Sequence, residues 1–248
     1  MKTIRFWFVG AILILGVSPL FAAESMPSSQ TIPNHPALSD DLNITLGVFY
    51  PRIATSASLA PSGGGTGATI DFEDTFDLDE RAVTPIANLF WRVSDNWRLD
   101  VGYFELSRDA TRTLAADVTW GDETFTAGTT VDASFDFSDL RISAAYSIFK
   151  RQDKELGIGL GLHVAGMKTS VQASGVGAEA SDVTAPLPVV NLYGVFALTN
   201  EWALSMRADW LSLSYGDYSG DVRNMEINFL YQPFSNVGFG LGARSLVI

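Results

Sequence analysis

From residue 42 onward, apolar and polar residues alternate along the chain in short segments separated by turns. A repeat of two residues is the period of a β-strand, whose side chains point alternately to its two sides. In the clearest segment, the apolar positions are Trp202, Leu204, Met206, Ala208 and Trp210, and the positions between them are Glu201, Ala203, Ser205, Arg207 and Asp209. Tryptophan closes the apolar side at both ends, and residues 202–210 have the length of a tilted strand that crosses a bilayer. The segment predicts a membrane-spanning strand with an aromatic residue at each interface.

Eight further segments alternate in the same way, at residues 42–50, 88–93, 97–103, 139–148, 156–165, 190–198, 224–231 and 237–244. The connections between them also alternate, in length. Short turns lie at about 94–96, 151–154, 199–200 and 233–236, and longer polar loops at about 61–81, 117–130 and 173–184, with a shorter one at 216–221. Short turns on one side and long loops on the other are typical of outer-membrane barrels. The pattern predicts an all-β fold, an antiparallel up-and-down transmembrane β-barrel of 8–10 strands over residues 42–248.

The number of segments is odd, whereas single-chain bacterial barrels have an even number of strands. One segment is not a strand, or one is divided wrongly, or the last strand is missing. We favour a ten-strand barrel without its final strand, because residues 245–248 lack the terminal aromatic residue that is usual in such barrels. An eight-strand barrel with one segment outside it is the alternative.

Residues 1–23 have the three parts of a secretory signal peptide. Lys2 and Arg5 precede an apolar run over residues 6–17, and small residues follow at Ala22 and Ala23. A membrane anchor is the alternative, but the run is short for one. Cleavage after either alanine places Leu20 or Phe21 at the third position before the cut, where a small residue is preferred. Residues 24–41, rich in Ser, Pro and Asp, predict a flexible lead-in.

Composition narrows the function classes. Hydrophobic residues make up 47% of the chain but are distributed, so that the part after the signal has no apolar run long enough for a spanning helix. The absence of cysteine excludes disulfides, thiolate metal sites and a lipoprotein anchor. A net charge of −12 argues against binding of nucleic acid, whose phosphates an acidic surface repels.

Charged residues of both signs occupy the sides of the strands opposite the apolar ones, which face a narrow lumen in a barrel of this size. Because buried charges require partners, these residues predict a salt-bridged network inside the barrel. The network either lines a selective pore or fills the lumen as a polar plug, and we favour the plug. The predicted members are Arg92, Arg98, Asp100, Asp139, Arg141, Arg207, Asp209, Glu226 and Arg244. Trp97, Tyr103, Trp202 and Trp210 are the predicted membrane-interface aromatics.

No catalytic, cofactor or metal site is predicted. His163 on the lumen side is read as a hydrogen-bonded filler, because Ser143 and Ser205 lie on distant strands and no G-x-S-x-G motif is present. Six carboxylates within residues 71–80 suggest a cation site or, as we prefer, a solvated acidic loop, since their spacing does not fit an EF-hand. Phe72, Phe76 and Leu78 between them can instead pack over the barrel mouth.

The segments at residues 42–50, 97–103, 156–164, 202–210 and 237–243 resemble the small outer-membrane barrel families of OmpA and OmpW type, and residues 179–188 and 198–202 resemble uncharacterised outer-membrane barrels of Gram-negative bacteria. The resemblance implies an outer-membrane location, contact with outer-membrane lipid and lipopolysaccharide, and little about function. The expected function is non-enzymatic, in envelope structure or passive passage of small solutes. An outer-membrane lipid-modifying enzyme and a soluble periplasmic barrel that binds an apolar ligand are the alternatives.

Overall fold

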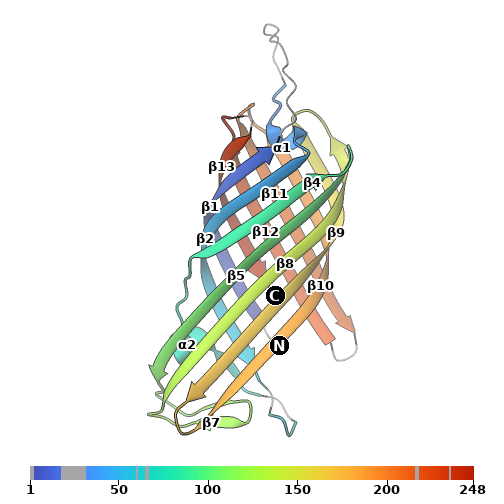
Figure 1. The fold of residues 1–248 in the computed structure, drawn as a ribbon. Coiled ribbons are helices and arrows are strands. Elements are labelled where there is room, and N and C mark those ends of the chain that lie inside the picture. The colour runs from blue at the N-terminus through green and yellow to red at the C-terminus, as the bar shows by residue number, and fades with distance from the viewer. Residues whose placement is uncertain (1–2, 18–31, 60, 65–66, 216–217, 235) are drawn as a thin grey trace.

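Ten antiparallel strands close into a barrel in the computed structural model, which describes residues 3–17, 32–59, 61–64, 67–215, 218–234 and 236–248 (Figure 1). Around the barrel the order is β1-β13-β12-β11-β10-β9-β8-β5-β4-β2, and β2 pairs again with β1. The barrel strands are β1 (Thr3–Val17), β2 (Leu42–Ser58), β4 (Thr84–Arg92), β5 (Trp97–Thr113), β8 (Thr130–Lys150), β9 (Lys154–Ala173), β10 (Gly177–Ala197), β11 (Trp202–Tyr215), β12 (Tyr218–Tyr231) and β13 (Val237–Val247). The predicted fold class, an up-and-down antiparallel transmembrane barrel, is confirmed.

The connections sort to two ends of the barrel. At the short-turn end, strands are joined through residues 93–96, 151–153, 198–201 and 232–236, and helix α1 (Pro36–Ser39) lies against it. The long-loop end carries β3 (Thr69–Asp71), α2 (Phe72–Phe76) and the hairpin of β6 (Val118–Trp120) and β7 (Glu123–Phe125). In the described parts of the chain, no helix is long and apolar enough to cross a bilayer.

Two predicted loops are wrong in extent. Residues 218–221 belong to β12. Residues 173–184 form the top of a long hairpin, in which Gly177 of β10 pairs with Ala173 of β9 and only residues 174–176 turn. Small and acidic residues on the outer side of this part of β10, such as Ala178 and Asp182, look like a loop because they lack the large apolar residues of a lipid-facing strand.

The nine predicted segments correspond to β2, β4, β5 and β8 through β13. The tenth strand precedes them in the sequence, so the prediction that the missing strand follows the last segment is wrong. It is β1, formed by residues of the predicted export signal, and it lies between β13 and β2. The signal itself remains a prediction, and its cleavage region falls outside the described residues.

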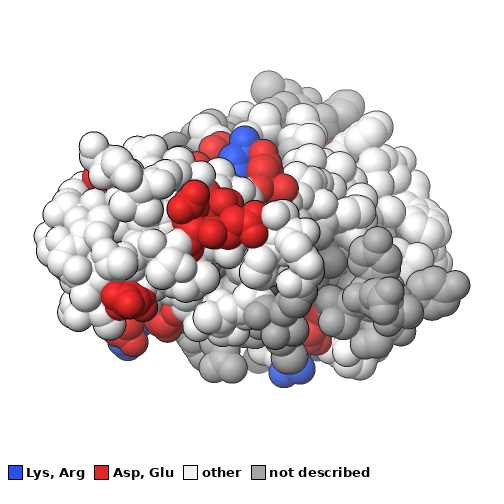
Figure 2. All heavy atoms as spheres, turned by 90° about the horizontal axis from the view of Figure 1, so that it is seen from below, with Lys and Arg blue, Asp and Glu red and all other residues white. Residues whose placement is uncertain are grey.

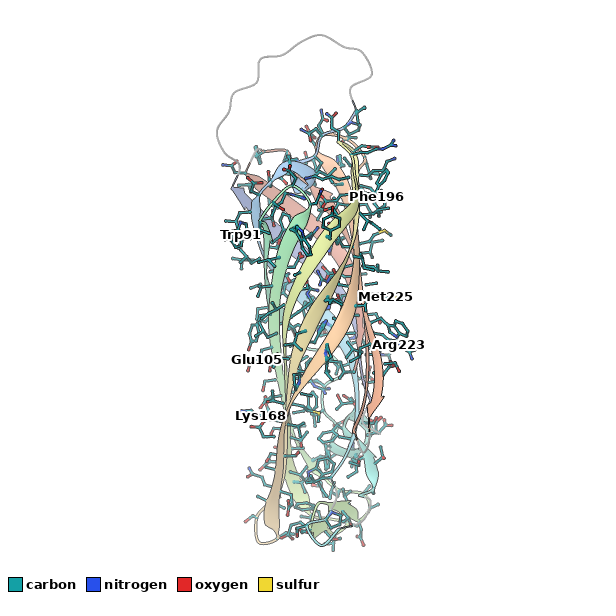
Figure 3. The ribbon with its side chains drawn as sticks, turned by 90° about the vertical axis from the view of Figure 1, so that its right-hand side faces the viewer. Trp91, Glu105, Lys168, Phe196, Arg223 and Met225 are labelled. Carbon is teal, nitrogen blue, oxygen red and sulfur yellow. The ribbon has the colours of Figure 1, made fainter. Side chains whose placement is uncertain are left out.

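The polarity of the barrel reverses along its length, as β8 shows most clearly. Near the long-loop end its inward side chains are apolar, at Val131, Ala133, Phe135 and Phe137, and its outward ones are polar, at Asp132, Ser134, Asp136 and Ser138. Toward the short-turn end the inward side chains become Asp139, Arg141, Ser143 and Ser147, and the outward ones Leu140, Ile142, Tyr146 and Ile148. Figure 3 shows the same division, with Trp91 in the half near α1 and Glu105 and Lys168 in the other half. A lipid-exposed band therefore surrounds only the half near the short turns.

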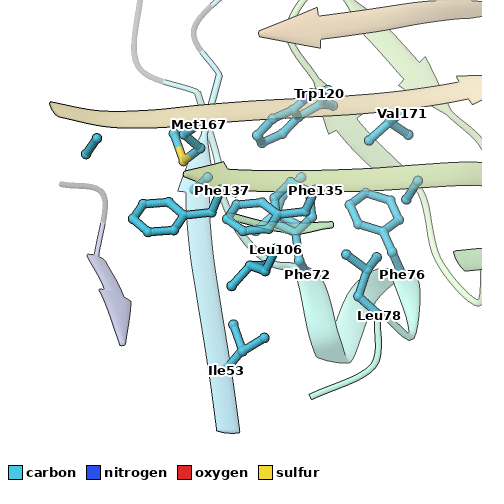
Figure 4. Close-up of a cluster of buried hydrophobic side chains, with 14 of the residues drawn as sticks. Ile53, Phe72, Phe76, Leu78, Leu106, Trp120, Phe135, Phe137, Met167 and Val171 are labelled. Atoms are coloured by element: carbon cyan, nitrogen blue, oxygen red, sulfur yellow. The ribbon is translucent and has the colours of Figure 1, made fainter. Parts of the chain in front are cut away.

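The half near the long loops has an interior like that of a soluble protein. Phe72 and Phe76 of α2 are fully buried and meet edge to face at 5.3 Å, and Phe72 also contacts Trp120 of β6 and Phe135 of β8 (Figure 4). Leu78 is buried in the same cluster. Phe72, Phe76 and Leu78 are thus packed inside the half near the long loops, in agreement with the alternative that the apolar residues of the acidic loop pack at the barrel mouth.

The predicted flexible lead-in is also corrected in its described part. Residues 34–40 fold against the short-turn end, because Pro36 starts α1, the ring of His35 accepts a hydrogen bond from the Ala37 N–H, and Leu38 is buried. His35 Nε2 also lies 3.2 Å from the Glu201 carbonyl oxygen, to which it donates. Burial lowers the pKa of His35.

Candidate functional site

The structure brings the nine predicted charged residues together on the inner side of the barrel, in the half that carries the lipid-exposed band. They come from six strands: Arg92 from β4, Arg98 and Asp100 from β5, Asp139 and Arg141 from β8, Arg207 and Asp209 from β11, Glu226 from β12 and Arg244 from β13. The period of two explains their placement, since residues i and i+2 of a strand share a face.

Arg92 pairs with a residue that the sequence analysis missed. Its guanidinium binds both carboxylate oxygens of Glu155, at 3.0 and 2.8 Å, and both side chains are buried. Glu155 also accepts hydrogen bonds from the hydroxyls of Ser147 and Tyr193. The ring of Tyr193 lies across Gly157, where a Cβ atom would come within 2.2 Å of it. Glu155 lies between the predicted turn at 151–154 and the predicted segment at 156–165, but in the structure it belongs to β9 and shares the inward face with Gly157.

The other eight predicted residues form two groups of ion pairs, one of six residues and one of Asp139 with Arg244. Arg98 binds both carboxylate oxygens of Asp100, at 3.0 and 2.6 Å. Arg207 lies 3.8 Å from Asp100 and donates at 3.1 Å to Asp209. Because Arg98 and Asp100, like Arg207 and Asp209, are two residues apart on one strand, each strand supplies its own ion pair and the barrel links the pairs to each other.

His163 joins the two groups. Its Nδ1 donates to Asp139 at 2.9 Å, and Nε2 lies 3.6 Å from Asp209. Asp139 accepts in addition from Arg244 at 3.1 Å. In the described part of the chain, His163 hydrogen-bonds a carboxylate rather than a serine hydroxyl, and the Ser143 hydroxyl accepts from Arg207. The arrangement is that of a structural histidine.

The interior is close to electrical balance. Five arginines, at positions 92, 98, 141, 207 and 244, meet five carboxylates, at positions 100, 139, 155, 209 and 226. The sum of formal charges is zero when His163 is neutral. Burial of ions costs free energy that only close pairing and hydrogen bonds offset, and this set provides both.

Two cavities lie within the network. The larger, of about 150 Å³, is lined by Arg98, Asp100 and Arg207 and, toward the short-turn end, by Ala37 of α1. The smaller, of about 30 Å³, lies toward Arg244 and Phe104. The same four residues, Asn88, Arg141, Glu226 and Asn228, line both cavities.

The residues shared by the two cavities form the loosest part of the network. Arg141 lies 3.4 Å from both Glu226 and Asn88, longer than the other arginine hydrogen bonds inside the barrel. The partition between the two cavities is therefore held by weak contacts.

All four predicted interface aromatics lie on the outside of the barrel and are exposed. Trp97 meets Tyr146 edge to face at 5.3 Å, and Trp202 stacks on Tyr231 at 4.3 Å, both at the short-turn end. Tyr103 and Trp210 lie further along their strands. Trp91 and Tyr146 are exposed on the outside as well, but their segments lack an aromatic residue at each end, which is the pattern that identified the four predicted residues.

The acidic loop is structured by its own carboxylates. Asp71 caps α2 by accepting from the Asp74 N–H, Glu73 pairs with Arg108 at 2.6 Å, and Glu80 pairs with Arg52 at 3.1 Å. Within the residues described, no group of three or more acidic or histidine side chains is placed to hold a metal ion. Figure 2, which views the long-loop end, shows acidic side chains near the middle of that surface.

No protein-family model and no curated protein matches the chain. Among solved structures it is similar to Ail, the attachment invasion locus protein of Yersinia pestis, with 9% identity and a TM-score of 0.37 over 100% of both chains. It is also similar to the translocator domain of the autotransporter NalP from Neisseria meningitidis (10% identity, TM-score 0.43, 99% of this chain and 86% of that one). A third is the outer membrane protease OmpT from Escherichia coli (10%, 0.39, 99% and 94%). Sequence identities and TM-scores this low do not indicate a function, which has to be argued from the residues of this chain.

Proposed function

We propose that the chain is a closed outer-membrane β-barrel with a structural role in the cell envelope, and that it is neither an open pore nor an enzyme. One observation carries the proposal: side chains block the barrel interior at several levels, although cavities of about 150 and 30 Å³ remain between them. Helix α1 lies over the short-turn end. The balanced ion-pair network occupies the half that carries the lipid-exposed band, which we call the lipid-level half, and the apolar cluster around Phe72 occupies the other half.

The outer surface supports the location. Large apolar side chains such as Leu46, Leu160 and Leu241 are exposed on the barrel exterior, where water would disfavour them and lipid would not. By analogy with barrels of this type, the short turns face the periplasm and the long loops the outside. The polar half then projects beyond the bilayer into the lipopolysaccharide layer, the expected partner together with outer-membrane lipid.

The two alternative functions have less support. A soluble barrel with an apolar ligand inside requires the reverse arrangement at the lipid-level half, with leucine inside and charge outside. A lipid-modifying enzyme requires a nucleophile beside a base, whereas His163 is engaged by Asp139 and is fully buried.

Passive passage of a small solute is the second candidate, and the two cavities favour it. Loss of the Arg141–Glu226 contact would join them. The joined space would still end at the apolar cluster, so passage would also require displacement of α2.

Conductance in planar bilayers tests the proposal. The refolded protein, shown to be closed by its heat-modifiable migration on a denaturing gel, should give no steady channel steps. The R141S/E226S variant should also stay silent, because the cluster around Phe72 is intact. The same variant with Phe72 and Phe76 changed to serine should conduct. Steady channels from the unmodified protein would refute the structural role and favour passage.

A further inference from the structure

The first and last of the nine predicted strands run in the same direction. Each of the connections from β2 to β13 reverses the chain, so β2 and β13 are parallel to each other. An up-and-down barrel requires antiparallel neighbours, and β2 and β13 cannot pair directly without breaking this rule. One strand that runs the opposite way must lie between them.

In the structure that strand is β1, which pairs with both edges. The register with β2 extends from Thr3 opposite Ser56 to Val17 opposite Leu42, and the register with β13 from Arg5 opposite Val247 to Leu15 opposite Val237. The pairing leaves neither β2 nor β13 with an open edge along the lipid-level half, where unpaired backbone groups have no water to bind.

The register also matches residue sizes across the three strands. Ile12 is level with Gly47 on one side and Gly240 on the other, and Ile14 is level with Gly238. Gly10, in turn, is level with Phe49. Ile12 and Ile14 are thus level with glycines of the neighbouring strands, whereas Gly10 is level with Gly242 as well as with Phe49.

We propose that β2 and β13 form a strand-acceptor site and that residues 3–17 are its occupant, kept after export as the tenth strand of the barrel. The segment then acts twice, first as the export signal and then as a structural strand. The poor match of residues 20–23 to a cleavage site, with Leu20 or Phe21 where a small residue is preferred, agrees with retention. The inference does not depend on what the barrel does.

Disulfide cross-linking tests the occupant, and the absence of native cysteine makes the test clean. Ala11 is level with Leu241 and with Val48. A residue in a central strand is hydrogen-bonded to one neighbour and not to the other, and a disulfide forms most readily across the non-bonded pair. We therefore expect A11C to cross-link with L241C or V48C in the membrane-recovered protein, with a migration shift that a reductant removes.

The matched control is A11C with V237C. Val237 is level with Leu15, which lies four residues beyond Ala11 in β1. At roughly 3.3 Å per residue, Val237 is therefore about 13 Å along β13 from Leu241, the partner of Ala11. This pair should not cross-link. A folded, heat-modifiable protein that forms neither of the two expected disulfides would overturn the proposal.

Mass spectrometry and a signal exchange test retention. The membrane-recovered protein should contain residues 3–17. A chain whose first 23 residues are replaced by a cleavable signal should still reach the periplasm but should lose the compact unheated band. If the exchanged chain forms that band, or if the native chain lacks residues 3–17 in its folded form, another strand occupies the site and the proposal fails.

Discussion

Phe137 and Asp139 project from β8 into the barrel two residues apart, and each is 1% exposed, yet they lie in opposite environments. Phe137 packs on the ring of Phe104 at 5.7 Å, whereas Asp139 accepts hydrogen bonds from His163 and Arg244. One strand thus joins an apolar core to an ionic one. On the outer side the order is reversed, so each half of the barrel suits the solvent around it.

The outer face of β9 allows a matched test of the lipid-exposed band. Leu160 and Ser170 are on the same side of the strand, and Leu160 is 71% exposed. L160K should destabilise the barrel by about 2–4 kcal/mol, because it places a charge in lipid. S170K should change the stability by less than about 0.5 kcal/mol, as expected of a surface position in water. Guanidinium unfolding in lipid vesicles measures both, and equal effects would contradict a band confined to one half.

The pair of Arg108 and Glu73 should hold the α2 loop on the barrel. Arg108 is buried, donates to Glu73, Thr55 and the Asp79 carbonyl, and lies over the ring of Phe135. R108A leaves Glu73 without its partner and should cost about 3–5 kcal/mol. Limited proteolysis should then cleave within residues 67–83 faster than in the parent protein.

The control for that change is a second ion pair of the α2 loop, in which Glu80 of the loop binds Arg52 of β2. Arg52 and Glu80 are also paired, but their side chains are 68% and 53% exposed. R52A should cost less than about 1 kcal/mol and leave the proteolysis rate unchanged. If both variants opened the loop equally, the burial of Arg108 would have no special role.

The Arg92–Glu155 pair should show strong non-additivity. E155Q keeps the shape of the side chain but leaves a buried guanidinium without a counter-charge, and we expect a loss of about 3–5 kcal/mol. The R92M/E155M double variant should cost less than either single change to methionine, since it buries no unpaired charge. A double-mutant cycle of unfolding free energies gives the coupling, and additive losses would contradict a tight pair.

The docking of residues 34–40 should depend on pH through His35. Because burial lowers the pKa of His35 in the docked state below its ordinary value of 6.5, the undocked state binds a proton first as pH falls. Docking is therefore complete above pH 6.5 and weakens as pH falls through 6.5 toward the lower pKa of the docked state. Protonation of Nδ1 also removes the acceptor for the Ala37 N–H. The protection of the Ala37 amide, measured as its exchange rate relative to the intrinsic rate at each pH, should fall between pH 8 and pH 5.

H35N is the control for this pH dependence. Asparagine is a good helix N-cap and does not titrate in this range. The variant should show slower or equal exchange at Ala37 at pH 5 and no change with pH beyond that of the intrinsic exchange chemistry. A parent protein whose exchange follows only the intrinsic rate would show that His35 does not control docking.

The lipid-level half was predictable from sequence because its pattern is simple. Large apolar residues alternate with charged ones in segments such as 97–103 and 202–210, and the charged residues could be assigned to one interior before any contact was known. Which arginine meets which carboxylate was not predictable. It depends on register across strands that are distant in sequence, as for Arg244 and Asp139.

The half near the long loops escaped prediction for a physical reason. Its strands keep the period of two but exchange the sides, so that Val131 and Phe135 face inward while Asp132 and Asp136 face outward. Judged by the lipid-facing pattern, such stretches look like polar loops. The sequence does contain a signal for these strands. The alternation continues without a break through β8, and only the face that carries the apolar residues changes, between Phe137 and Leu140.

The exchange of apolar and polar residues between the inner and outer faces also sets how deeply the barrel sits in the membrane. Along the outer face of β8, Asp136 and Leu140 are separated only by Ser138. A shift of two residues along the strand is about 6.6 Å. Movement of that size in one direction draws the Asp136 carboxylate into hydrocarbon, and in the other it lifts Leu140 into water. Because neighbouring strands carry the same boundary, at Tyr103 and Glu105 on β5 and at Val164 and Lys168 on β9, the molecule is held at one vertical position and resists displacement in either sense.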